Sequence, residues 1–84
     1  MAKPLFDKEL LDKVEEQVNP QHYKRGGVEC IEGIKASMSA EAFQGYLKGN
    51  TIKYLWRWPL KGTKDLEKAQ WYLNRLIKEH EQTT

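Results

Sequence analysis

Apolar residues recur at helical intervals along most of the chain, and no alternating pattern of useful length predicts a strand. Residues 5–17 predict an amphipathic helix with a narrow apolar stripe, which consists of Phe6, Leu10, Leu11, Val14 and, just beyond it, Val18. We expect this helix to pack on the rest of the domain or to contact a second subunit. Asn19 and Pro20 then interrupt the periodicity, because proline lacks a backbone N–H and restricts the residue before it.

The middle of the chain predicts a second, a third and a fourth helix. Val28 opens a new apolar period directly after Gly26–Gly27, whose backbone could approach an anion at the start of the second helix. Ser39 is the predicted N-cap of a short third helix. We expect Gly49 either to end that helix or to kink it before a further helix that starts at Asn50.

The last segment predicts the longest apolar stripe. Pro59 is expected to end the preceding helix, Gly62 to make the turn, and Thr63 to cap a final helix. The stripe of this helix consists of Leu66, Ala69, Leu73, Leu76, Ile77 and His80. The whole pattern therefore predicts an all-α fold, a compact domain of four to five helices.

Size and composition indicate how such a domain is stabilised. The chain has 84 residues, including three Trp, four Tyr and two Phe. A domain of this size buries only part of its surface, so we expect a homo-oligomer. Residues 1–18 would form the N-terminal amphipathic helix and residues 19–84 the functional domain. The single cysteine, Cys30, excludes an internal disulfide and is expected in the core.

The charge balance narrows the possible partners. A net charge of +2 is too small to neutralise many phosphates of a long nucleic acid, although local clusters of Lys and Arg could hold a small anion. No segment approaches the roughly 20 apolar residues that span a bilayer, and the N-terminus lacks the apolar core of a signal peptide. We therefore expect a cytoplasmic protein without membrane or long nucleic acid partners. Without paired Cys and His ligands, no metal site is predicted.

Cationic side chains alternate with large aromatic ones between Asn50 and Lys61. Helical spacing predicts an anion-binding side with Asn50, Lys53, Tyr54 and Arg57, and a core-forming side with Ile52, Leu55, Trp56 and Trp58. Arginine offers a planar fork for two phosphate oxygens, and tyrosine a ring that can lie against a base. This combination favours a phosphorylated, ring-bearing ligand. An ordinary solvated helix with cation–π contacts has the same composition, so that alternative stays open.

Three motifs in a fixed order extend this pattern. The chain reads Asn-Pro-Gln-His-Tyr at 19–23, Asn-Thr-Ile-Lys-Tyr-Leu-Trp-Arg at 50–57, and Asp-Leu-Glu-Lys-Ala-Gln-Trp-Tyr-Leu at 65–73. With these motifs it resembles a family of small phage proteins of unknown function that is often labelled nucleotide kinase. A coliphage nucleotide kinase without a P-loop contains the same domain. The N-terminal amphipathic helix lies outside the resemblance.

The resemblance implies a nucleotide- or phosphate-binding set that consists of Asn19, His22, Tyr23, Asn50, Lys53, Tyr54, Arg57, Lys68 and Tyr72. His22 could hydrogen-bond a phosphate or transfer a proton, but a histidine beside a proline also fixes turns. Tyr23 could stack on a base or anchor the core. Asp65 also occupies a motif position, where it could complement the helix dipole or pair with Arg57 or Lys68.

A kinase must hold two nucleotides and Mg²⁺ and must align donor with acceptor. The sequence has no GxxxxGKS/T motif, whereas binding alone demands only charge, a ring and a pocket. Our hypothesis is that the protein binds a nucleotide-like small molecule without a cofactor and sequesters a host immune signalling nucleotide in the host cytoplasm. One alternative is a nucleoside monophosphate kinase that uses Mg²⁺. Another is a structural or host-protein-binding helical module.

Overall fold

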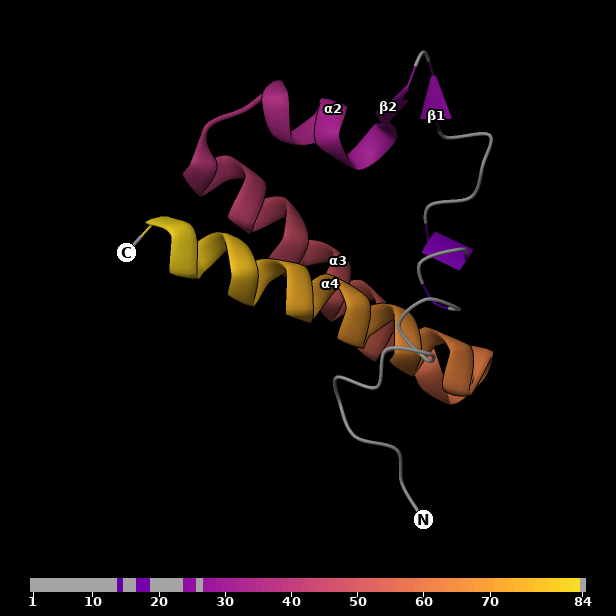
Figure 1. Cartoon of the computed structure of the whole chain (residues 1–84). Helices are drawn as coiled ribbons and strands as arrows, with labels where there is room; N and C mark the ends of the chain where they lie inside the picture. Colours follow the sequence, from indigo (N-terminus) through magenta and orange to yellow (C-terminus); the bar gives the residue numbers. More distant parts are fainter. Residues whose placement is uncertain (1–13, 15–16, 19–23, 26, 84) are drawn as a thin grey trace.

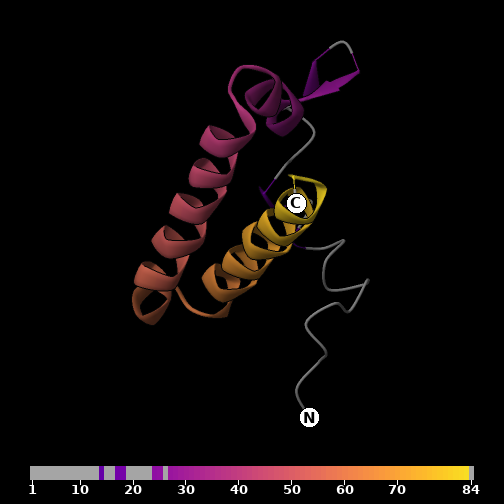
Figure 2. The same ribbon diagram turned by 90° about the vertical axis from the view of Figure 1, so that its left-hand side faces the viewer.

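The computed structural model describes residues 14, 17–18, 24–25 and 27–83. Its elements are, in chain order, β1 (Lys24–Arg25), β2 (Val28–Glu29), α2 (Cys30–Ala36), α3 (Ala40–Lys61) and α4 (Thr63–Thr83). The helices α3 and α4 run back along each other as an antiparallel hairpin, and α2 lies at the end where α3 begins and α4 ends (Figures 1 and 2). The helical fold class is thus confirmed, but the described residues contain three helices instead of four to five.

The N-terminal predictions fall largely outside the described residues. This holds for most of the helix expected over residues 5–17 and for the domain boundary expected after residue 18, which both stay predictions. Two members of the expected stripe are described. Val14 is 1% exposed, and Val18 is half-buried against the aromatic core. These two apolar side chains are therefore buried or half-buried within a single chain, without a second subunit.

The third and fourth predicted helices are one continuous helix, α3. Ser39 caps it as predicted, because its hydroxyl accepts a hydrogen bond of 3.1 Å from the Ala42 backbone N–H. Gly49 does not end the helix, which runs from Ala40 to Lys61. A glycine inside a helix costs only about 0.5–1 kcal/mol relative to alanine, and the buried neighbours Leu47 and Thr51 hold the helix against α4 on both sides of it.

The end of α3 also differs from the prediction. Pro59 lies inside the helix, which ends two residues later at Lys61. The proline has no N–H to donate to the carbonyl four residues before it, so α3 lacks that hydrogen bond in its last turn. Gly62 makes the turn as predicted. Its φ is +87°, which a residue with a side chain rarely adopts, and its N–H donates to the Trp58 carbonyl at 2.7 Å. Thr63 was predicted to be the N-cap that precedes the final helix, but it is the first residue of α4.

A small antiparallel hairpin replaces the expected start of the second helix. β1 pairs with β2 through Lys24–Glu29 and Arg25–Val28, and Gly27 turns the chain with a φ of +81°. The helix α2 begins at Cys30 and not at Val28. The glycine that was expected to approach an anion therefore serves this turn, because glycine tolerates a positive φ without steric strain.

The core lies between α2 and one side of the α3–α4 hairpin. Its buried members are Ile31, Phe43, Leu47 and Tyr72, and the half-buried residues packed against them are Val18, Ile34, Tyr46, Tyr54, Trp71 and Leu76. The predicted core-forming side of the Asn50 segment is wrong. Ile52 and Leu55 are each 49% exposed, and Trp56 is 83% exposed. Cys30 is exposed as well, and not a core residue.

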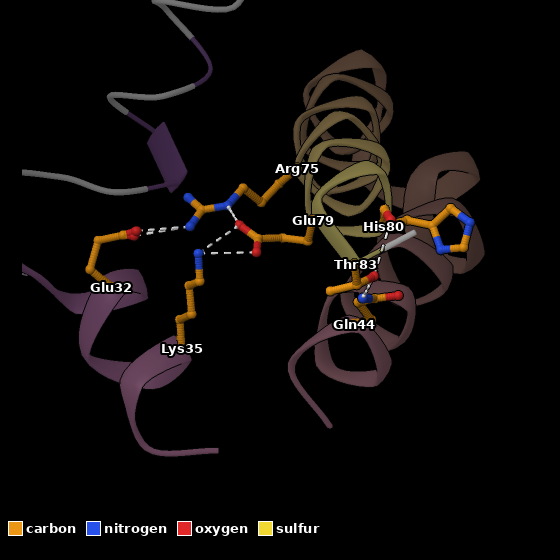
Figure 3. Close-up of polar contacts among 7 residues, drawn as sticks. All are labelled: Glu32, Lys35, Gln44, Arg75, Glu79, His80 and Thr83. Carbon is orange, nitrogen blue, oxygen red and sulfur yellow. Dashed lines mark hydrogen bonds and ion pairs between the residues drawn. The ribbon is translucent and has the colours of Figure 1, made fainter. Parts of the chain in front are cut away.

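Ionic contacts fasten α2 to α4 (Figure 3). The Arg75 guanidinium donates to both oxygens of Glu32 at 2.8 and 2.9 Å, and its Nε donates to Glu79 at 2.8 Å. Lys35 reaches the same Glu79 carboxylate at 3.1 Å. Burial acts to raise the pKa of Glu79, but the hydrogen bonds and positive charges of Arg75 and Lys35 outweigh it and lower that pKa. The ionised form of Glu79 is therefore part of the folded structure.

Candidate functional site

The predicted site residues on α3 and α4 meet around one tyrosine ring. Tyr54 of α3 stacks on Tyr72 of α4, with ring centroids 5.7 Å apart and an interplanar angle of 15°. Tyr72 is 7% exposed and also contacts the rings of Tyr46 and Trp71. Tyr54 thus rests on the aromatic core, and Tyr72 supports it from inside. The aromatic packing fixes where the polar groups of Tyr54 and its neighbours can lie.

Three cationic groups gather at the same ring. The Lys53 Nζ, the Arg57 Cζ and the Lys68 Nζ lie 4.6, 5.4 and 5.5 Å from the Tyr54 ring centroid. Lys53 and Arg57 come from α3 and Lys68 from α4, so the turn at Gly62 is what brings them together. We call these residues, together with Tyr54, the Tyr54 cluster. Cation–π attraction holds each cation, but the three like charges repel one another, and a bound anion would relieve this repulsion.

The arrangement changes the expected role of Tyr54. Its ring already contacts Tyr72 and three cations in this structure. A base could stack on Tyr54 only if these cations moved. The cluster therefore presents positive charge more readily than an aromatic platform.

Asp65 connects the cluster to the interior. Its Oδ2 lies 3.1 Å from the Arg57 Nε, its side chain is 3% exposed, and that of Arg57 is 41% exposed. Sequence reasoning left Asp65 out of the binding set, although pairing with Arg57 was one of the roles considered for it. The sequence signal for this pair is the short spacing between Arg57 and Asp65 across Gly62. A one-residue turn at Gly62 brings the first turn of α4 beside the last turns of α3. A carboxylate this deeply buried needs a cationic partner to offset its lost hydration.

The other predicted site residues do not join the cluster. The Asn50 side-chain amide donates to the Tyr46 carbonyl of its own helix at 3.1 Å, so this amide serves α3. Asn19, His22 and Tyr23 lie outside the described residues, and their roles stay predictions. On the α2 side of the hairpin there is a cavity of about 60 Å³, lined by Val18, Cys30, Ile31, Ile34, Tyr46, Trp71 and Tyr72. Ligand pockets usually measure about 300–1,000 Å³, so this cavity is too small for a nucleotide.

Two further findings concern the described residues alone. They contain no group of three His, Cys, Asp or Glu side chains placed to hold a metal ion. None of the helices in this part of the chain has the length and apolar character that crossing a membrane requires.

Comparisons with known proteins agree with these motifs. The model of DUF3310, a protein family of unknown function, matches residues 17–74, a range that includes the whole Tyr54 cluster and Asp65. The chain belongs to DUF3310. Its curated relatives are phage proteins, as the resemblance predicted.

Two curated relatives illustrate the similarity. The "Gene 1.7 protein" of Enterobacteria phage T3 is 45% identical over 60 residues, which cover 64% of this chain and 37% of the relative. The "Nucleotide kinase gp1.7" of Escherichia phage T7 is 36% identical over 83 residues, which cover 92% of this chain and 42% of the relative. The chain thus spans about two fifths of the length of these relatives. No solved structure matches it significantly.

Proposed function

We propose that the chain binds a phosphorylated nucleotide or a nucleotide-derived ligand at the Tyr54 cluster. The observation that supports this proposal is the convergence of Lys53, Arg57 and Lys68 on one ring from two helices. The three cations repel one another, so an anion bound among them would be stabilised by all three. A phosphate group would satisfy all three.

The local charge suits a phosphate. Within the described residues Asp65 is the one carboxylate that pairs with the cluster, and it contacts Arg57. Among the described residues, the three cations of the cluster and Asp65 together carry a net positive charge of two. Lys53 is exposed and Lys68 half-buried, so both ammonium groups can reach a ligand from solvent. Charge-assisted hydrogen bonds to phosphate are among the stronger polar contacts in proteins.

The form of this function that we favour is sequestration of a host immune signalling nucleotide. Sequestration requires tight binding without chemical change, and the Tyr54 cluster supplies the positive charge that holding a phosphate requires. Phosphoryl transfer would in addition require a second nucleotide and Mg²⁺, both aligned with the first.

A nucleotide kinase is the second candidate. The observation that favours it is the name of the phage T7 relative, "Nucleotide kinase gp1.7". In this case Lys53, Arg57 and Lys68 would clamp a phosphate during transfer, and Mg²⁺ would neutralise the charge that develops.

One experiment separates the two candidates. The purified chain is mixed with a panel of nucleoside monophosphates and cyclic dinucleotides, binding is measured by calorimetry, and the bound fraction is released by heat and analysed by chromatography. A parallel mixture contains ATP, Mg²⁺ and each monophosphate. Sequestration predicts recovery of the ligand unchanged and no nucleoside diphosphate. Diphosphate that forms steadily with the parent and disappears with Lys53→Ala or Arg57→Ala would establish the kinase instead.

A further inference from the structure

Arg57 and Asp65 form an ion pair between the two helices of the hairpin. Asp65 has a side chain that is 3% exposed, and its Oδ2 has no hydrogen bond of good geometry within the described residues. Its cationic contact is the Arg57 Nε at 3.1 Å. Asp65 belongs to the first turn of α4, and Arg57 lies one turn before the end of α3. The pair therefore spans the interhelical turn.

The atom that Asp65 contacts determines what Arg57 can still do. A guanidinium has one Nε and two terminal nitrogens in a single plane, and a carboxylate at Nε leaves the terminal pair free for a second acceptor. The Arg57 side chain is 41% exposed, so part of it faces solvent. The Lys53 Nζ and the Lys68 Nζ lie near the same ring as the guanidinium. A guanidinium beside two ammonium groups is a suitable arrangement for one phosphate group.

We propose that Asp65 is a positioning residue, which holds Arg57 through Nε so that its two terminal nitrogens bind a ligand phosphate as a fork. This inference rests on the proposed binding function and adds a role for a buried residue that no ligand needs to touch. The benefit is entropic, because an arginine that is already held loses less side-chain freedom when the ligand arrives.

This role predicts an effect whose sign is opposite to that of simple electrostatics. Asp65→Asn removes a negative charge from an anion site, and charge alone would therefore strengthen anion binding. Positioning predicts the reverse, since Arg57 would lose its anchor. We expect Asp65→Asn to weaken binding by about three- to tenfold, the loss typical of one oriented hydrogen bond.

The test is a double-mutant cycle with Arg57→Ala, measured by calorimetry on the full chain. The probes are inorganic pyrophosphate, which has no base, and a panel of nucleoside 5′-monophosphates. We expect Asp65→Asn to cost about three- to tenfold in the parent and almost nothing in the Arg57→Ala background, because the two residues act as one unit. Tighter or unchanged binding by Asp65→Asn would overturn the inference. So would equal losses in both backgrounds, which would indicate a general effect on the fold.

A second measurement keeps the inference testable even if Asp65→Asn does not fold. The chain contains three arginines, at positions 25, 57 and 75, so their Nε–H resonances can be resolved by NMR. In the ligand-free parent we expect Arg57 to be as rigid on the picosecond–nanosecond timescale as Arg75, whose Nε donates to Glu79 at 2.8 Å. A freely rotating Arg57 side chain would overturn the role of Asp65.

The outcomes also separate this inference from the proposed function. If the parent binds neither pyrophosphate nor any nucleotide, the proposed function is wrong and the inference falls with it. If the parent binds and Asp65→Asn binds at least as well, the binding function stands and only the role of Asp65 is wrong.

Discussion

Both sides of the α3–α4 hairpin contain apolar residues, but in the described part of the chain only one of them packs against α2. On one side, which we call the covered side, α2 packs on Phe43, Tyr46 and Tyr72. The other side, the open side, has a groove of about 210 Å³ lined by Thr51, Leu55, Leu66, Ala69, Gln70, Leu73, Asn74 and Ile77. A second hollow continues it through the shared residues Leu73 and Ile77. Leu73 is 44% exposed, whereas its neighbour Tyr72 is 7% exposed.

The difference shows how a two-helix hairpin divides its apolar residues. Successive residues of a helix point about 100° apart, so Tyr72 and Leu73 belong to different sides although both are apolar. α2 contributes Ile31 and Ile34 to one side only. The covered side therefore has the rigid aromatic base on which Tyr54 rests. The open side is the surface on which we propose that the chain associates with a second copy, because its lining residues Leu55, Leu73 and Ile77 are exposed large apolar side chains on a small domain.

The covered side should depend most on Arg75. We expect Arg75→Ala to lower the free energy of unfolding by about 2–4 kcal/mol, because it leaves the Glu79 carboxylate, which is 7% exposed, with only Lys35. Lys35→Ala is the matched control in the same network and should cost less than about 1 kcal/mol, since Lys35 is 43% exposed. Chemical denaturation of both variants measures this. Similar losses would show that α2 is not fastened mainly through Arg75.

The Tyr54 cluster, which rests on the aromatic core of the covered side, should determine ligand affinity. Arg57→Ala is expected to weaken nucleotide binding about tenfold or more, the loss of a charge-assisted hydrogen bond worth roughly 1.5–3 kcal/mol. Lys61→Ala removes a cation from the exposed end of the same helix and should change affinity much less. Calorimetry on both variants, with circular dichroism as a check of the fold, tests this difference. An Arg57→Ala variant that binds as tightly as the parent would assign Arg57 a purely structural role.

The open side should determine assembly. We expect the parent to sediment as an oligomer at micromolar concentration, and Leu73→Glu to weaken association by at least about tenfold, because it would place a charge in an apolar contact. Lys78→Glu introduces the same side chain at an exposed position that does not line the groove. It should leave the oligomer unchanged. A parent that is monomeric across this concentration range would contradict the proposal for the open side.

The smallest expected effect is the pH dependence of the stability that Glu79 contributes to the covered side. The pKa of Glu79 is lowered in the folded chain, so its contribution to stability is fully present above its ordinary value of 4.5 and is lost as the pH falls through the folded value. Glu79→Gln should therefore lose less stability than the parent on acidification from neutral pH to below 4.5. Thermal unfolding over this range measures the difference. Parallel pH profiles for the two proteins would show that other groups dominate acid unfolding.

The sequence predicted local features of the fold better than features that depend on packing. The helical class, the Ser39 cap and the Gly62 turn were predicted correctly, because helical periodicity, capping and a positive φ are local properties of a few neighbouring residues. The helix end considered at Gly49 was wrong, because packing of Leu47 and Thr51 against α4 outweighs a weak local preference. The predicted start of α2 was wrong for a different reason. A two-residue strand is too short to produce an alternating pattern.

For the site, the sequence determined which residue types were available, and it placed Lys53, Tyr54 and Arg57 within one helical turn of each other. Only the tertiary structure decided that Tyr54 faces the core while Leu55 and Trp56 face outward, the reverse of what the segment predicted. The physical reason is that an apolar stripe in the sequence indicates that a helix face is buried, but it does not specify which other element packs against that face. The turn at Gly62 sets how α4 meets α3, and through it Lys68, Tyr72 and the buried Asp65 reach Tyr54 and Arg57.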